Sequence, residues 1–275
     1  MLKRRMIRGA TLVIALLFAN LVVLEMSNAT EEETATAETE QLLENVLAEN
    51  TAKEAYPYLY ASGTVTEKEL PEKVAFLTFD DGPSRNTVKI MDTLAEYNAK
   101  ATFFVIGEHL TEDGIEIAKR ALSEGHMLGM HTETHEYETI YDSVDSFLAD
   151  YDKLASRFIE AFGECPAIFR FPGGSYSAYI NPIRTQLQEE MERRGFLGYD
   201  WTVSGEDSVG TPTAASIKKN IFDMVYSGKE PIILLHDSPC SNLTAEVLPD
   251  ILKQLTEEGY TFMTLQYREP YQFPW

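Results

Sequence analysis

From residue 74 onward, short apolar runs alternate with longer segments in which apolar residues recur every three or four positions. A short apolar run bounded by turn residues predicts a buried strand, and the longer spacing predicts a helix with one buried face. Strands are expected at residues 74–79, 101–106, 127–130, 167–171, 197–201, 232–235 and 260–264. Helices are expected between them, at residues 87–97, 115–124, 143–162, 182–194, 214–226 and 245–258.

Strands separated by helices pair in parallel through right-handed crossovers. The pattern therefore predicts one α/β domain, either barrel-like or doubly wound, at residues 73–275. No short-period repeat and no second folded domain is visible in the sequence. In both arrangements the chemistry lies at the carboxyl ends of the strands.

The first 29 residues have the pattern of an export signal or a membrane anchor. Lys3, Arg4, Arg5 and Arg8 precede an apolar run at residues 10–24 that only Asn20 interrupts. That length suits a signal peptide, since a membrane span usually needs about 20 residues, but Ser27-Asn28-Ala29 is a poor cleavage site. Either form leaves the following residues outside the cytoplasm. Residues 30–72 are expected to form an acidic stalk, rich in Glu, Ala and Thr at 31–54, and a lead-in at 56–72 that packs on the edge of the domain.

Composition narrows the choice of partners. The formal net charge of −21 argues against nucleic acid, because phosphate binding needs a basic face. Cys165 precedes one predicted strand and Cys240 follows another, so two separate thiols are expected at opposite ends of the sheet. We expect the protein to be a monomer.

Polar side chains gather where the predicted strands end. They are Asp80 and Asp81, His131 and His135, Arg170, Asp200 and Trp201, and His236 and Asp237. Three of the five His residues of the chain are among them. Because the carboxyl ends of parallel strands meet at one edge, these residues predict a single site.

The spacing of these residues suggests a metal centre. Neighbouring strand residues point to opposite faces, so Asp80 and Asp81 serve one site only if Asp81 already lies in the turn begun by Gly82. On a helix or a compact loop, His131 and His135 can converge on one ion. With Asp81 they form a set of two His and one carboxylate, which suits catalytic zinc or non-haem iron.

Three further strand-end residues are candidates for chemistry. Arg170 could pair with Asp80, and the backbone at Gly173 can approach a substrate closely and donate an N–H to a developing oxyanion. His236 ends an apolar strand and is a candidate proton donor. His109 and His126 do not lie at ligand positions and are interpreted as structural.

Five motifs in order resemble the polysaccharide deacetylase family, the NodB homology domain of carbohydrate esterase family 4. They are Thr-Phe-Asp-Asp-Gly-Pro at 78–83, His-Thr-x-x-His at 131–135, Arg-Phe-Pro-Gly-Gly at 170–174, Asp-Trp at 200–201 and Leu-Leu-His at 234–236. The resemblance covers about residues 74–266. It implies a distorted (β/α)7 barrel of parallel strands with one divalent metal ion, usually zinc and sometimes cobalt or another ion.

The resemblance also implies a role for each matching residue. Asp81, His131 and His135 resemble the metal ligands, Asp80 the general base, His236 the general acid, Arg170 the residue that holds the base, and Asp200 the carboxylate that orients the acid. Gly173 resembles the backbone donor to the oxyanion, and Trp201 and Leu234 the walls of the acetyl-methyl pocket. The sequence departs from the family at Leu197, where an Asp is frequent, and at Gly173, where a larger residue is frequent, so the preferred sugar stays open.

The implied reaction is hydrolytic N-deacetylation of an acetylated amino sugar in an extracytoplasmic polysaccharide. The export segment favours peptidoglycan N-acetylglucosamine, and chitin-like or secreted polysaccharides are further candidates. One alternative is a hydrolase of the same fold that acts on a small amide or ester. Another is a non-catalytic module that binds wall glycan, although such modules usually lack Asp80, a ligand or His236, all of which are present. The ligand set alone would also suit an iron oxygenase.

Overall fold

The computed structural model describes residues 54–274. The predicted signal or anchor at residues 1–29, and the stalk as far as residue 53, lie outside the described residues. The residues from Tyr56 onward form one compact unit. No helix in residues 54–274 has the length and apolar character that a membrane span requires.

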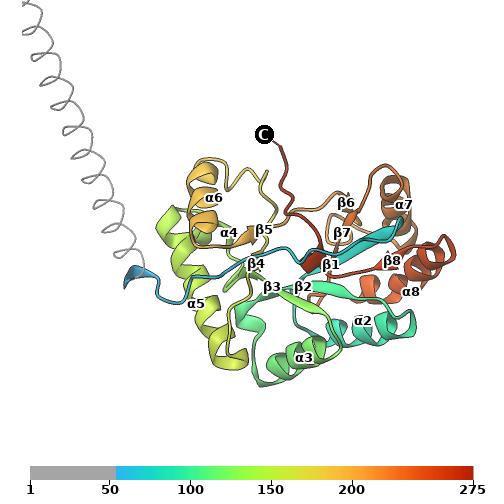
Figure 1. The fold of residues 1–275 in the computed structure, drawn as a ribbon, viewed down its shortest axis with the longest axis horizontal. Coiled ribbons are helices and arrows are strands. Elements are labelled where there is room, and N and C mark those ends of the chain that lie inside the picture. The colour runs from blue at the N-terminus through green and yellow to red at the C-terminus, as the bar shows by residue number, and fades with distance from the viewer. Residues whose placement is uncertain (1–53, 275) are drawn as a thin grey trace, which may run out of the picture. The chain divides into compact units, whose positions relative to one another are not determined.

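One sheet of parallel strands organises this unit (Figure 1). The strands are β1 (Val74–Gly82), β2 (Ala101–Ile106), β3 (Met127–Thr132), β4 (Ile168–Phe169), β5 (Leu197–Gly198), β6 (Val203–Ser204), β7 (Ile232–His236) and β8 (Thr261–Phe262). Their order is β5-β4-β3-β2-β1-β7-β6, and β8 pairs with the beginning of β1. The long strands β1 and β2 are buried along almost their whole length, as expected for parallel strands that are covered on both faces.

The connection between β5 and β6 shows that the sheet is curled. These strands stand at opposite ends of the strand order, yet only residues 199–202 join them. Since a residue spans at most about 3.6 Å, the two edges must approach each other. The sheet is therefore a half-barrel, in agreement with the predicted distorted barrel, and the doubly wound alternative is wrong.

The short elements are where the predicted and observed structures differ. The expected strand at residues 197–201 ends at Gly198, and β6 follows it as a separate strand that the pattern did not predict. Helix α4 (Tyr137–Ile140) was not predicted either. Elements of two to four residues carry too few apolar positions for a periodic signal.

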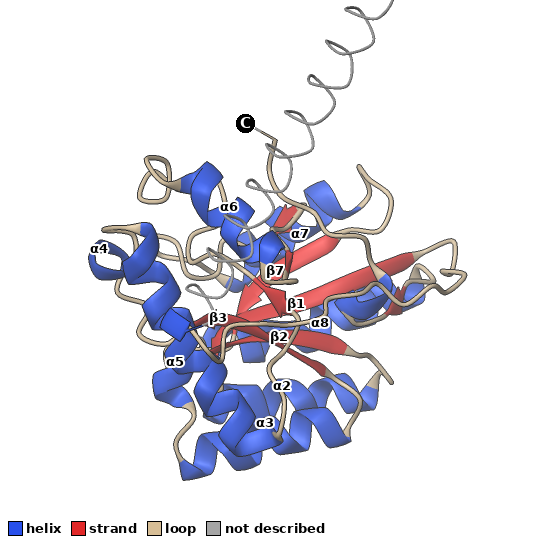
Figure 2. Cartoon of the chain, turned by 60° about the vertical axis from the view of Figure 1, so that its left-hand side comes forward, coloured by secondary structure: helices blue, strands red, loops and turns tan. Residues whose placement is uncertain are grey.

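The remaining helices cover the outside of the strands (Figures 1 and 2). They are α2 (Arg85–Glu96), α3 (Glu112–Ser123), α5 (Val144–Phe162), α6 (Arg184–Arg193), α7 (Ala214–Val225) and α8 (Asn242–Glu257). A hydroxyl side chain caps the first turn of α2, α3, α5 and α7, accepting from a backbone N–H that has no partner within the helix. These caps fix where each helix starts after a strand-end loop.

Residues 56–72 pack against the domain rather than extending from it. Leu59 is fully buried in the main core. The Ala61 N–H donates to the Arg194 carbonyl at 2.9 Å, and the Gly63 N–H donates to the Gly195 carbonyl at 2.8 Å. The segment is thus held across the turn that leads from α6 into β5.

Candidate active site

A cavity of about 270 Å³ opens at the carboxyl ends of β1, β3 and β7. Eight of the ten predicted site residues line it, namely Asp80, Asp81, His131, His135, Gly173, Trp201, Leu234 and His236. Tyr137, Tyr176, Ser204, Glu206, Ser208 and Val209 complete the lining. The structure therefore brings together most of the residues that the strand-end pattern selected.

A bulge in β1 brings Asp80 and Asp81 to the same site. The pairing of β1 with β2 shifts register between Asp80 and Gly82, and Asp81 has a left-handed φ of 73°. The bulge breaks the alternation of side chains, so adjacent residues no longer face opposite sides. His109 stabilises this conformation, since its Nδ1 lies 2.9 Å from the Asp81 carbonyl oxygen and donates to it.

Asp81, His131 and His135 form the one group in residues 54–274 with the arrangement of metal ligands. Their ligand atoms all lie within 4.8 Å of one another. Asp81 Oδ1 is 3.4 Å from His131 Nε2 and 3.3 Å from His135 Nε2. His131 lies on β3, whereas His135 lies in the compact loop after it with a left-handed φ of 60°.

The hydrogen bonds of this group fit a cation. His131 Nδ1 lies 2.9 Å from the Arg170 carbonyl oxygen, which can only accept, so Nδ1 carries the hydrogen. In the neutral ring Nε2 then directs its lone pair at Asp81. The Oδ1 atom of Asp81 is buried and has no hydrogen-bond partner among the described residues. A lone pair and a carboxylate oxygen that face each other repel unless a cation lies between them.

The protonation states also suit metal binding. Burial alone would raise the pKa of Asp81, but the His131 and His135 rings lower it below its ordinary range. Burial lowers the pKa of His135 to about 4. At neutral pH Asp81 is therefore ionised and His135 is neutral, as metal ligands must be.

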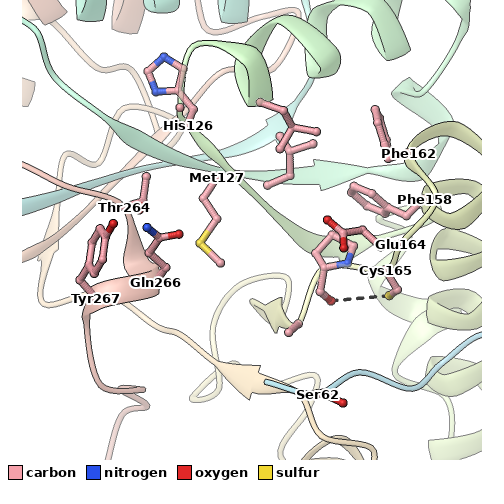
Figure 3. A pocket seen from close by; sticks show the side chains of 15 residues that line it. Ser62, His126, Met127, Phe158, Phe162, Glu164, Cys165, Thr264, Gln266 and Tyr267 are labelled. Atoms are coloured by element: carbon pink, nitrogen blue, oxygen red, sulfur yellow. Dashed lines mark hydrogen bonds between the residues drawn. The ribbon is translucent and has the colours of Figure 1, made fainter. Parts of the chain in front are cut away.

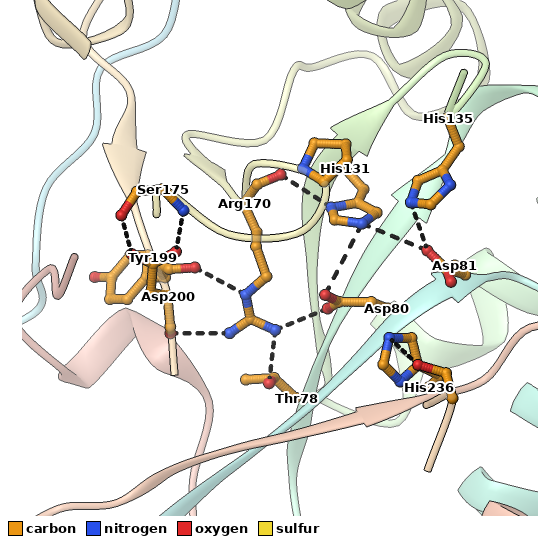
Figure 4. Close-up of polar contacts among 12 residues, drawn as sticks. Thr78, Asp80, Asp81, His131, His135, Arg170, Ser175, Tyr199, Asp200 and His236 are labelled. Carbon is orange, nitrogen blue, oxygen red and sulfur yellow. Dashed lines mark hydrogen bonds and ion pairs between the residues drawn. The ribbon is translucent and has the colours of Figure 1, made fainter. Parts of the chain in front are cut away.

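Arg170 holds Asp80 through a buried ion pair (Figure 4). The guanidinium is fully buried and donates to Asp80 Oδ1 at 2.7 Å and to Thr78 Oγ1 at 2.8 Å. It also donates to the carbonyl oxygens of Tyr199 at 2.8 Å and Asp200 at 3.1 Å. Both charges of the pair are satisfied, so the carboxylate is fixed in position at the cavity. The predicted Arg170–Asp80 pair is confirmed.

The partner of His236 is Asp207. His236 Nδ1 lies 2.9 Å from Asp207 Oδ1, and the His236 N–H donates to Asp207 Oδ2 at 2.8 Å. Thr244 Oγ1 donates to the same carboxylate at 2.6 Å. Burial alone would lower the pKa of His236, but the hydrogen bond and the charge of Asp207 outweigh it and raise the pKa to about 9. His236 is therefore protonated at neutral pH.

The predicted contact between Asp200 and His236 is wrong. Asp200 Oδ1 accepts from the Ser175 N–H at 2.9 Å (Figure 4). Asp200 Oδ2 accepts from the Phe273 N–H at 2.8 Å. Residues 199–202 cross from β5 to β6, whereas Asp207 follows β6, which pairs directly with β7. The sequence carries no strand-end signal for Asp207, because the two residues of β6 are too few to predict a strand there.

Comparison with known proteins agrees with this geometry. A sequence model of the family described as Polysaccharide deacetylase matches residues 67–191. A peptidoglycan-N-acetylglucosamine deacetylase of Bacillus cereus is 35% identical over 207 residues, which are 74% of this chain and 72% of that protein. This chain belongs to the polysaccharide deacetylase family.

Two solved structures that are similar to this deacetylase belong to enzymes with different substrates. The catalytic domain of a peptidoglycan N-acetylglucosamine deacetylase from Eubacterium rectale has a TM-score of 0.70 and 31% identity, over 78% of this chain and 97% of that chain. A family 4 acetyl xylan esterase from Clostridium thermocellum, in complex with a cobalt ion, has a TM-score of 0.58 and 28% identity, over 70% of this chain and 88% of that chain. The family and the enzyme class are therefore shown, and the polymer is a separate question.

Helix α5 supports the loop that carries the candidate metal ligands of this deacetylase. Asp150 accepts four hydrogen bonds from the loop between the two His ligands. They come from Thr132 Oγ1 at 2.6 Å, Glu133 N at 2.7 Å, Thr134 N at 3.2 Å and Thr134 Oγ1 at 2.8 Å. The next residue, Tyr151, donates its hydroxyl to the His131 and Arg170 carbonyl oxygens. Two consecutive residues of one helix thus fix the backbone from His131 to Thr134.

Replacing Asp150 by Asn is therefore expected to weaken the binding of a divalent cation about 10- to 100-fold, the usual effect of removing a group that orients ligands. Competition with a chromogenic chelator measures this affinity directly. Asp152→Asn is the matched control, because Asp152 lies on the same helix and accepts from the Tyr58 and Leu59 N–H groups, away from the loop. Equal affinity for the cation in the two variants would show that Asp150 does not orient the ligands.

A larger cavity, of about 710 Å³, lies where β3 begins and ahead of β4 (Figure 3). Its lining includes His126 and Cys165. The Ala101 N–H donates to His126 Nδ1 at 3.1 Å, which is a structural role, as predicted. Burial raises the pKa of Cys165 to about 12, so its thiol stays protonated. Cys165 and Cys240 are both free, which confirms the prediction of two separate thiols.

Proposed function

We propose that this deacetylase removes the acetyl group from N-acetylglucosamine residues of peptidoglycan, outside the cytoplasm, with zinc held by Asp81, His131 and His135. The observation that carries the reaction type is the pairing of Asp80 with His236 at the ends of β1 and β7. Arg170 holds the carboxylate and Asp207 holds the imidazole, so a base and an acid flank the candidate metal site. Two-His-one-carboxylate ligation with an open position is the pattern of catalytic zinc.

Asp80 and His236 each carry out one proton transfer of the proposed reaction. A divalent cation bound here would supply Lewis acidity, which activates water and polarises a carbonyl. Asp80 takes the proton of the attacking water, and the Gly173 N–H donates to the oxyanion that develops on the acetyl carbonyl. His236 gives its proton to the departing nitrogen, and the products are acetate and a free amine. Trp201 and Leu234 line the cavity and offer apolar contacts to the acetyl methyl group.

The state of His236 favours an amide over an ester as the substrate bond. An amine leaves only after its nitrogen is protonated, whereas an alkoxide leaves with less help from an acid. Asp207 keeps His236 protonated up to a pKa of about 9, so the acid is charged at the pH of most environments. This property is what the cleavage of N-acetylated glycans requires.

The polymer and the location rest on the relatives and on the N-terminal sequence. The B. cereus and E. rectale proteins are named as peptidoglycan N-acetylglucosamine deacetylases. The basic head and apolar run at residues 1–24 predict export, as a secreted protein or one anchored to the membrane and facing the wall. Both features support a substrate in the cell wall.

Acetate release from a panel of glycans tests this proposal. The zinc-loaded chain is incubated with peptidoglycan, chito-oligosaccharides and acetylated xylan, and acetate is measured by an enzymatic assay. Release is expected from peptidoglycan and chito-oligosaccharides, and it should stop when a chelator removes the metal. Release from xylan alone would contradict the proposed substrate and leave the enzyme class intact.

A further inference from the structure

The cavity that holds the candidate metal ligands is too small to enclose a polymer. Pockets that enclose a drug-sized ligand measure roughly 300–1,000 Å³. The volume here is about 270 Å³, which suits about one sugar residue. If the proposed function holds, the neighbouring residues of the glycan must lie against the surface outside the cavity.

The rim of the cavity carries an exposed aromatic ring. Tyr176 lines the cavity and is 57% exposed. Single exposed aromatic residues are common on protein surfaces and need no explanation. Tyr176 differs because other rings hold it in place. Phe273 meets it edge-on with centroids 4.7 Å apart, and Trp201 does so at 6.1 Å.

Three distant parts of the chain form this aromatic wall. Tyr176 follows β4, Trp201 lies between β5 and β6, and Phe273 belongs to the C-terminal tail, residues 268–274. Trp201 and Phe273 also pack on each other, with centroids 5.3 Å apart. Gly174 has a left-handed φ of 80°, and a Cβ there would lie 2.8 Å from Trp201, so only glycine lets the backbone pack this closely.

Asp200 holds these parts together. Its carboxylate is 1% exposed and accepts from the N–H groups of Ser175 at 2.9 Å and Phe273 at 2.8 Å. Its own N–H donates to the Tyr271 carbonyl at 2.6 Å. One buried carboxylate thus joins the Tyr176 loop to the C-terminal tail and leaves Tyr176 little freedom to move. Burying a carboxylate is costly unless it is fully hydrogen-bonded, and here it orders the rim of the site.

We propose that Tyr176, supported by Phe273 and Trp201, is a stacking platform for the sugar residue next to the one that is deacetylated. Asp200 is the positioning residue of this platform, and the C-terminal tail is part of the substrate site. A sugar ring presents a face of C–H groups that packs on an aromatic face, while its hydroxyl groups stay in water. A rigid ring provides such contact area at a low entropic cost.

The test compares the full zinc-loaded chain and its variants on chitotetraose and on 4-nitrophenyl acetate, which carries no sugar. Tyr176→Ala is expected to lower the ratio of the two kcat/KM values about tenfold, mainly through a higher KM for chitotetraose. Tyr176→Phe keeps the ring and should restore the ratio. Tyr226→Ala is the matched control, because Tyr226 is a 50% exposed Tyr at the end of α7, outside the cavity lining. An unchanged ratio in Tyr176→Ala would overturn the platform.

Asp200→Asn and Phe273→Ala extend the test to the support of the ring. Both should lower the same ratio, and Phe273→Ala removes a ring that is only partly buried, so it threatens folding less than a substitution in the core. In Asp200→Asn the alkaline limb of the rate profile should stay in place. A shift of that limb would show that Asp200 acts on the pKa of His236, and it would overturn the role of Asp200 in positioning Tyr176. If the wild type cleaves 4-nitrophenyl acetate but releases no acetate from chitotetraose or from peptidoglycan, the proposed function itself fails.

Discussion

Acetate release should fall by about 10³-fold when Asp80 is replaced by Asn, while zinc stays bound. The Asn side chain can still accept the hydrogen bond that Arg170 donates at 2.7 Å, but it cannot take a proton from water. Asp80 is not a member of the ligand group Asp81, His131 and His135, so the metal site keeps its donors. Acetate assays and zinc analysis of the purified variant measure the two effects separately.

Two controls make the Asp80→Asn result interpretable. In this variant the buried Arg170 charge no longer has an ionised partner, and breaking a buried ion pair can cost about 3–5 kcal/mol of stability. Thermal unfolding measures whether the variant is destabilised. Asp142→Asn removes an exposed carboxylate from the loop between α4 and α5 and should leave acetate release at the wild-type level. Wild-type turnover in Asp80→Asn would exclude Asp80 as the base.

Asp207→Asn is expected to lower activity about 100-fold above neutral pH and to move the alkaline limb of the rate profile to lower pH by one unit or more. The acid works only when protonated, so the rate falls as pH rises through the pKa of His236, which Asp207 raises to about 9. Without the carboxylate, burial dominates and the pKa drops. Because wild type and variant carry the same metal, the cation acts on both profiles and cancels in the comparison.

The assay is acetate release at saturating substrate from pH 5 to 10. Asp200→Asn serves as the control because Asp200 was the partner expected from the sequence, although the structure places its carboxylate on Ser175 and Phe273. If the limb moved in Asp200→Asn and stayed in place in Asp207→Asn, the observed pairing would not be the one that acts in solution.

The long elements of the fold could be predicted because each carries its own signal. The apolar runs at residues 101–106 and 232–235 agree with β2 and β7 to within one residue. Strand β6 could not be predicted, because its two residues are too few for a pattern and its pairing with β7 arises only in the folded chain. The curl of the sheet depends on that same short strand.

The candidate metal ligands show what the sequence could predict and what only the folded structure could show. His131 and His135 are close in the sequence, so their spacing predicted that they could converge, and in the structure their ligand atoms do. Asp81 stands beside Asp80 and should face away from it on a regular strand. Only the bulge, with its left-handed φ of 73° at Asp81, turns both carboxylates toward one cavity.

The sequence by itself determined which residue types stand at the carboxyl ends of the strands, because hydrophobic periodicity and the order of the chain are local properties. Tertiary structure decided which carboxylate meets His236. Asp207 and Asp200 both lie far from His236 in the chain, and the path of residues 199–202 from one edge of the sheet to the other separates them. That path is set by pairing between strands that are distant in the sequence, so local sequence patterns could not predict it.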